Sequence, residues 1–62
     1  MEFNIGDNVI ITADRFNGMQ VKVKDVDQKN KMALVIFPWY YSKWYYFDDL
    51  KHVIAEDIGK EE

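Results

Sequence analysis

The 62-residue sequence has no cysteine, one proline, three glycines and one histidine. Without cysteine, neither disulfide bridges nor thiolate metal sites can support the fold. No apolar run approaches the roughly 20 residues that cross a bilayer, and the N-terminal stretch has no basic segment followed by a long apolar run. We therefore expect a cytoplasmic protein with no membrane association. A chain this short forms one domain and buries only about 60% of the surface that its unfolded form exposes.

The residues that usually carry catalysis are also scarce. His52 is the only histidine, and no serine or cysteine stands at a helpful spacing from it. Two carboxylate pairs, Asp25 with Asp27 and Asp48 with Asp49, fall at predicted turns and supply fewer oxygen ligands than a divalent ion prefers. No glycine-rich phosphate loop is present. We expect no enzyme, no cofactor, no metal site and no small-molecule substrate.

Charge is distributed unevenly along the chain. Residues 15–51 carry seven basic and four acidic groups, whereas the two ends together carry seven acidic groups and one basic group, which gives a net charge of −3. A general nucleic-acid binder normally has a basic domain. The slightly basic body and the acidic ends therefore give little overall attraction for a polyanion.

Apolar residues alternate with polar ones in short segments, and turn signals separate these segments. No helical periodicity of useful length precedes residue 50, and Asn17-Gly18 predicts a tight turn. The predicted strands are residues 8–12, 19–27, 32–37, 42–47 and 51–54. Five short strands satisfy their edges by curling into a small barrel. We predict an all-β, five-stranded barrel over residues 1–54 and a charged, flexible tail over residues 55–62 that frays.

Eight aromatic residues crowd into residues 37–47. Alternation assigns Phe37, Tyr45 and Phe47 to the barrel interior. The other five rings are assigned to the outside or to a loop: Trp39, Tyr40, Tyr41, Trp44 and Tyr46. Three or four such rings together would expose about 400–800 Å², at or above the largest apolar patch of a typical monomer. The sequence thus predicts an interaction surface.

Short motifs give the chain a resemblance to a known family. The residues read F-x-I-G-D-x-V-x-I-T from Phe3, then R-F-x-G, V-x-x-V-D and F-D-D-L. This pattern resembles the KOW module at the C-terminus of NusG-type transcription factors, which is a five-stranded SH3-like barrel. Tudor domains share the opening motif and the strand spacing, and are the second choice.

The resemblance implies a partner surface built from two loops. By position, its apolar residues fall on Phe16 and Met19 in the first loop and on Trp39 and Tyr40 in the second. The sequence departs from the family at Val21, where a characteristic glycine is expected. It also has a shorter segment between the third and fourth strands.

These observations predict a non-enzymatic adaptor that docks a protein of the transcription or translation machinery. The predicted partner-binding residues are Phe16, Met19, Trp39, Tyr40, Tyr41, Trp44 and Tyr46. The same rings, rimmed by Lys22, Lys24 and Lys43, suit the alternative of RNA or single-stranded nucleic-acid binding. Further alternatives are a Tudor-like cage for a methylated cation, a homodimer formed through the aromatic patch, and a small phage or mobile-element protein that inhibits a host factor.

Overall fold

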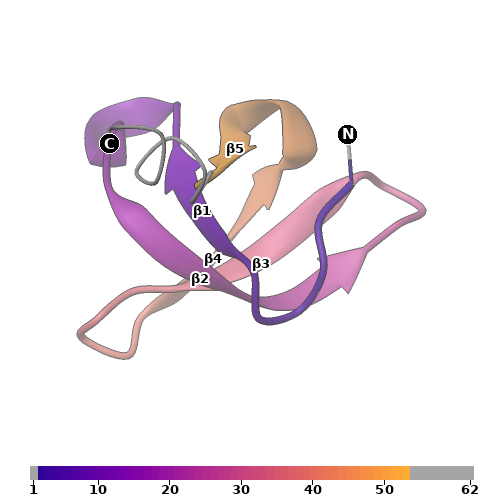
Figure 1. Cartoon of the computed structure of the whole chain (residues 1–62), viewed down its shortest axis with the longest axis horizontal. Coiled ribbons are helices and arrows are strands. Elements are labelled where there is room, and N and C mark those ends of the chain that lie inside the picture. The colour runs from indigo at the N-terminus through magenta and orange to yellow at the C-terminus, as the bar shows by residue number, and fades with distance from the viewer. Residues whose placement is uncertain (1, 54–62) are drawn as a thin grey trace, which may run out of the picture.

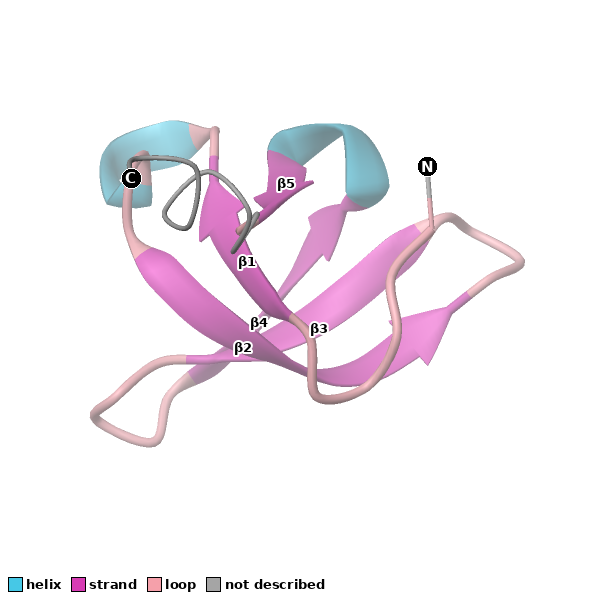
Figure 2. Ribbon diagram, viewed as in Figure 1, coloured by secondary structure: helices cyan, strands magenta, loops and turns pink. Residues whose placement is uncertain are grey.

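A computed structural model describes residues 2–53 and shows five antiparallel strands in one sheet. The elements, in chain order, are β1 (Asn8–Ile11), the 3₁₀ turn η1 (Asp14–Phe16), β2 (Gln20–Asp27), β3 (Met32–Ile36), β4 (Ser42–Tyr46), the 3₁₀ turn η2 (Phe47–Asp49) and β5 (Leu50–His52). Figures 1 and 2 show β3 crossing β2, the longest strand, beneath β1 and β5. The all-β prediction is confirmed.

The strand order in the sheet is β4-β3-β2-β1-β5. The sheet curls around one core, as an SH3-like barrel does (Figure 1). Within residues 2–53, β4 pairs only with β3 and β5 pairs only with β1. These two strands are therefore the edges of the sheet, and no ladder between them closes it.

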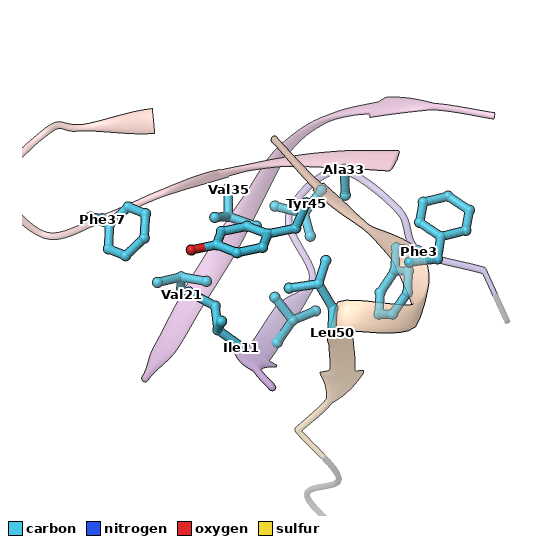
Figure 3. Close-up of a cluster of buried hydrophobic side chains, with 11 residues drawn as sticks. Phe3, Ile11, Val21, Ala33, Val35, Phe37, Tyr45 and Leu50 are labelled. Carbon is cyan, nitrogen blue, oxygen red and sulfur yellow. The ribbon is translucent and has the colours of Figure 1, made fainter. Parts of the chain in front are cut away.

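Eleven buried apolar residues form the core: Phe3, Val9, Ile11, Val21, Val23, Ala33, Val35, Phe37, Tyr45, Phe47 and Leu50. Figure 3 shows Phe37 at one end of this cluster and Phe3 at the other. The interior positions predicted for Phe37, Tyr45 and Phe47 are confirmed, since these side chains are only 2–5% exposed. Tyr45 lies in β4, while Phe37 directly follows β3 and Phe47 directly follows β4. Each continues the alternation of its strand, in which successive side chains point to opposite faces.

A β-bulge at Lys24 interrupts the alternation in β2. Val23 pairs with Val35, but the next pair joins Asp25 to Leu34, so Lys24 is the extra residue. The bulge shifts the phase of the strand and brings Val26 to the core side. The expectation that Asp25 lies at a turn is wrong, because Asp25 lies inside β2.

The first loop turns at Gly18, as the Asn17-Gly18 pair predicts. Asn17 has φ −51° and ψ 128°, Gly18 has φ +94°, and the amide of Met19 donates to the Phe16 carbonyl at 2.9 Å. This is a type II turn, in which only the second central residue needs positive φ. Met19 follows it, half-buried against the core and one residue before β2 begins.

Several predicted strand boundaries differ from the observed ones by one or two residues. Phe47 belongs to η2 rather than to the fourth strand, because the chain turns there before β5. The fifth strand ends at His52, and Ile54 and the predicted tail 55–62 lie outside the described residues. In the part of the chain that is described, no helix is long and apolar enough to cross a membrane.

Candidate functional site

Two loops meet at the Phe37 end of the core and surround a cavity of about 640 Å³. We call it the aromatic cavity, and its lining residues are Asp14, Arg15, Phe16, Trp39, Tyr41 and Lys43. The first three come from η1, Trp39 and Tyr41 come from the β3–β4 loop, and Lys43 comes from β4. The cavity thus joins residues that are more than twenty positions apart in the sequence.

The rings of the cavity rest on Phe37. The ring centroid of Phe37 lies 4.8 Å from that of Phe16, 5.1 Å from that of Trp39 and 5.5 Å from that of Tyr41. All three pairs are tilted, a geometry that aromatic rings prefer to face-to-face stacking. Since Phe37 is 2% exposed while Trp39 and Tyr41 are 53% and 47% exposed, the cavity is an outward extension of the core.

A tight turn places Trp39 and Tyr41 at the cavity. Pro38 occupies the second position of this turn, where its fixed φ is favoured, and the Tyr40 amide donates to the Phe37 carbonyl at 2.9 Å. The Phe37 amide in turn donates to the Tyr41 carbonyl at 2.7 Å, which closes the loop. Tyr40 has φ +64°, a left-handed conformation that costs free energy in a residue with a Cβ.

Asp14 ties the first loop to β4. One carboxylate oxygen accepts a hydrogen bond from the Phe16 amide at 2.8 Å. The other accepts from Lys43 Nζ at 2.9 Å and from the Tyr45 hydroxyl at 2.8 Å. Because Tyr45 is a core residue, these bonds fix η1, and with it the Phe16 ring, relative to the barrel.

The same contacts set the protonation of the cluster. The bond from Lys43 and the bonds from the Phe16 amide and the Tyr45 hydroxyl stabilise the carboxylate and lower the pKa of Asp14 to about 2. Burial, together with the bond to Asp14, raises the pKa of the Tyr45 hydroxyl above its ordinary value. The hydroxyl therefore stays protonated and donates, while Asp14 stays charged and accepts, across the physiological pH range.

Cations lie against the ring faces. The Arg15 guanidinium carbon lies 5.2 Å from the centroid of Phe16. Lys43 Nζ lies 5.9 Å from the Phe16 centroid and 5.0 Å from that of Tyr45. These distances are in the range of cation–π contacts. Since Asp14 pairs with Lys43, Arg15 contributes the excess positive charge of the cavity.

The structure distributes the predicted partner-binding residues over more than one surface. Phe16, Trp39 and Tyr41 come together in the aromatic cavity. Tyr40, 89% exposed, instead lines a shallow depression beside Pro38. Trp44 and Tyr46 lie on the opposite side of β4 from Lys43, as alternation requires.

Trp44 and Tyr46 belong to an apolar surface outside the barrel. Trp44 lies opposite Leu34 and Tyr46 lies opposite Met32 in the β3–β4 ladder. We call this surface the outer β3–β4 face, and its residues are Met32, Leu34, Ile36, Trp44 and Tyr46. The unbroken apolar run of β3 is thereby explained, since one side of the strand fills the core and the other side forms this face.

The three lysines predicted as a nucleic-acid rim do not share one site. Lys43 lines the aromatic cavity, Lys22 lines the depression beside Tyr40, and Lys24 lies at the bulge in β2. Sequence reasoning missed Asp14 and Arg15, although both directly precede Phe16 in the predicted first loop. The charged pair beside a loop aromatic is the signal that points to them.

His52, the one histidine, has structural partners. Its ring stacks on Phe3 with centroids 4.4 Å apart, and Nε2 lies 2.8 Å from the Glu2 carbonyl. Since a carbonyl only accepts, Nε2 carries the proton in this bond. Among residues 2–53, no group of three or more metal-binding side chains is found.

Comparison with known proteins identifies the first part of the chain. A family model, the KOW motif, matches residues 5–37, which run from the turn before β1 through Phe37. No curated protein matches the chain. KOW is a binding motif and not a catalytic family, so the chain carries a small binding module. Because the match covers more than half of the 62 residues, this protein belongs to the KOW family.

Proposed function

We propose that this protein is a non-enzymatic adaptor that docks a protein of the transcription or translation machinery at the aromatic cavity. The observation that carries the proposal is the convergence of Phe16, Trp39 and Tyr41 from two loops onto Phe37. Exposed rings held in a depression are typical of the anchor sites that dominate binding energy. A cytoplasmic location goes with this class of partner and is part of the proposal.

The mechanism is burial of an apolar anchor against rings that are already ordered. Asp14 holds η1 against β4, and the Pro38 turn holds the second loop, so little side-chain entropy is lost on binding. A partner side chain that enters the cavity covers Trp39 and Tyr41, which are about half exposed in the free protein. Arg15 at the rim favours a carboxylate beside that anchor.

The charges at the cavity argue against a cage for a methylated cation. Three rings do line one cavity, as such a cage needs, but Arg15 and Lys43 already lie against the Phe16 ring. A third cation would meet two like charges there, and only the Asp14 carboxylate would offset them.

Nucleic-acid binding is the second candidate function. The observation in its favour is that Arg15 and the exposed rings of Trp39 and Tyr41 share one cavity, the pairing that single-strand binders use for stacking and phosphate contact. The chain's net charge of −3 and the separation of Lys22 and Lys24 from the cavity reduce the electrostatic attraction that such binding needs.

The test is capture of partners by the wild-type protein and by two variants that stay folded. Trp39→Ala removes the cavity ring and should weaken capture by about 2 kcal/mol or more, roughly 30-fold. Trp44→Ala is the matched control, because it removes the same side chain at similar exposure from the outer β3–β4 face. Equal capture by wild type and Trp39→Ala would overturn the proposal.

Salt titration then separates the two candidate functions. Nucleic-acid binding should weaken steeply between 50 and 200 mM salt, because phosphate contacts release counterions. The affinity of an apolar anchor for the cavity should change little over the same range. Arg15→Gln should reduce the small salt dependence that remains.

A further inference from the structure

β4 is one edge of the sheet, on the far side from β5. In the β3–β4 ladder the Phe37 amide donates to the Tyr41 carbonyl, and the Phe47 amide donates to the Lys31 carbonyl. Antiparallel ladders bond every second residue, so Lys43 and Tyr45 point their backbone groups toward β3. Ser42, Trp44 and Tyr46 therefore point theirs toward the open edge.

The edge groups have no partner among the described residues. No hydrogen bond to the amides of Ser42, Trp44 and Tyr46, or to the carbonyls of Ser42 and Trp44, is found within residues 2–53. The Tyr46 carbonyl is the exception, because Tyr46 is the N-cap of η2 and its carbonyl accepts the first bond of that turn. Three donors and two acceptors are thus left facing outward.

Natural proteins protect such edges with charge, proline, bulges or very short strands. β4 is five residues long and carries one charge, Lys43, whose ammonium is paired with Asp14 at 2.9 Å inside the same molecule. Pro38 lies in the preceding loop and the bulge lies in β2. β4 lacks these protections, and the exposed rings of Trp44 and Tyr46 lie beside its edge.

We propose that a second copy of this chain pairs with β4 in antiparallel orientation about a two-fold axis at Trp44. Each Trp44 amide then donates to the other copy's Trp44 carbonyl, and each Tyr46 amide donates to the other copy's Ser42 carbonyl. These four bonds use every unpaired edge group except the Ser42 amide, which faces the other copy's Tyr46 carbonyl, and the arrangement is isologous, as in most homodimers.

Side chains also fit this register. The two Trp44 rings lie directly opposite each other and extend the outer β3–β4 face from one copy to the other. Lys43 lies opposite Tyr45 of the second copy rather than opposite Lys43, so no like charges face each other. The aromatic cavity lies on the other side of β4, and this dimer leaves it open.

The area buried indicates a weak dimer. Trp44 and Tyr46 are 41% and 58% exposed, so covering them removes roughly 100 Å² of accessible surface from each side chain. With the edge backbone, each copy buries about 300–400 Å², at most half of the roughly 800 Å² per partner of a stable complex. We therefore expect a dissociation constant on the order of 100 μM.

The experiment is sedimentation equilibrium of the full chain up to about 1 mM, with amide exchange followed by NMR over the same range. A dimer should appear, and the Trp44 and Tyr46 amides should become slower to exchange as concentration rises. Lys43 and Tyr45 amides, bonded to β3, should be protected at every concentration. A chain that stays monomeric at 1 mM overturns the proposal.

Two edge variants and one control locate the contact. Trp44→Lys places two like charges opposite each other and should weaken the dimer at least tenfold. Tyr46→Pro removes an edge amide at a residue whose φ of −70° suits proline, without removing a bond to β3, and should do the same. Trp39→Lys adds the same charge at the cavity and should change the dissociation constant less than twofold.

The outcomes separate this dimer from other contacts. A dimer lost in Trp39→Lys and kept in both edge variants would be a contact through the aromatic cavity, and would overturn the proposal. A dimer in which the edge amides exchange freely would do so too, since strand pairing must protect them. Loss of partner capture by Trp39→Ala leaves the β4 dimer unaffected, so the two proposals fail independently.

Discussion

The Tyr45 hydroxyl gives the sharpest test of how the core supports the site. Tyr45→Phe keeps a buried ring that is 4% exposed and removes the 2.8 Å bond donated to Asp14. Asp14 keeps its bonds from Lys43 and from the Phe16 amide, and water can reach its exposed carboxylate. The free energy of unfolding should therefore fall by the net value of one hydrogen bond, about 1 kcal/mol. It should not fall by the larger amount that an unpaired buried charge costs.

A loss of about 1 kcal/mol corresponds to a fall in Tm of about 4–8 °C for a domain of this size. Thermal and urea unfolding followed by circular dichroism measure it. Tyr41→Phe is the matched control, because the Tyr41 hydroxyl makes no hydrogen bond within the described residues; its Tm should stay within about 1 °C.

A second readout of the same substitution is the titration of Asp14. Its carboxylate loses one of the donors that lower its pKa, so the pKa should rise from about 2 toward the ordinary value of 3.8. Carboxyl-carbon NMR measures this shift. If Tyr45→Phe changes neither the unfolding free energy nor the Asp14 titration, the assignment of Asp14 as the tie between η1 and β4 is wrong.

Three further predictions concern other parts of the chain. Tyr40→Gly should raise the unfolding free energy by about 0.5–1 kcal/mol in urea titrations, because it relieves the left-handed φ of +64°, and a destabilised variant would contradict this. Phe3→Ala should lower the free energy of unfolding by about 3–5 kcal/mol, whereas a 62-residue domain has roughly 3–9 kcal/mol in all. Circular dichroism of this variant should therefore show partial or complete unfolding at 25 °C, and a native spectrum would refute this. Because the pKa of Asp14 is lowered, its carboxylate stabilises the fold fully above about pH 4, and this contribution is lost as pH falls toward about 2. The urea midpoint should accordingly fall more between pH 4 and pH 2 in the wild type than in Asp14→Asn, and parallel curves would contradict it.

The sequence predicted side-chain orientation where alternation is regular. Tyr45 in β4 faces the interior as expected, because a period of two leaves a strand residue only two faces to choose from. Phe37 and Phe47, which directly follow β3 and β4, continue the same alternation. The bulge at Lys24 was not predicted, since an extra residue is visible only when the pairing with β3 is known. It reverses which side chains face the core in the part of β2 that follows Lys24.

The candidate site was predicted in part for a related reason. Phe16, Trp39 and Tyr41 stand out in the sequence as loop aromatics, and the structure brings them to one cavity. Asp14 does not stand out, because its role rests on bonds to residues 29 and 31 positions away. The separation of Trp44 from Trp39 likewise follows from the sheet, which lies between the cavity and the outer β3–β4 face.

This separation of the two tryptophans makes the protein its own optical probe. Trp39 lies at the aromatic cavity and Trp44 on the outer β3–β4 face, and both are about half exposed. A protein that retains only Trp39 reports on the cavity through its fluorescence, and one that retains only Trp44 reports on the β4 edge. Emission from each shifts to shorter wavelength when its own surface is covered, so occupancy of each surface can be followed in its own single-tryptophan variant without any added label.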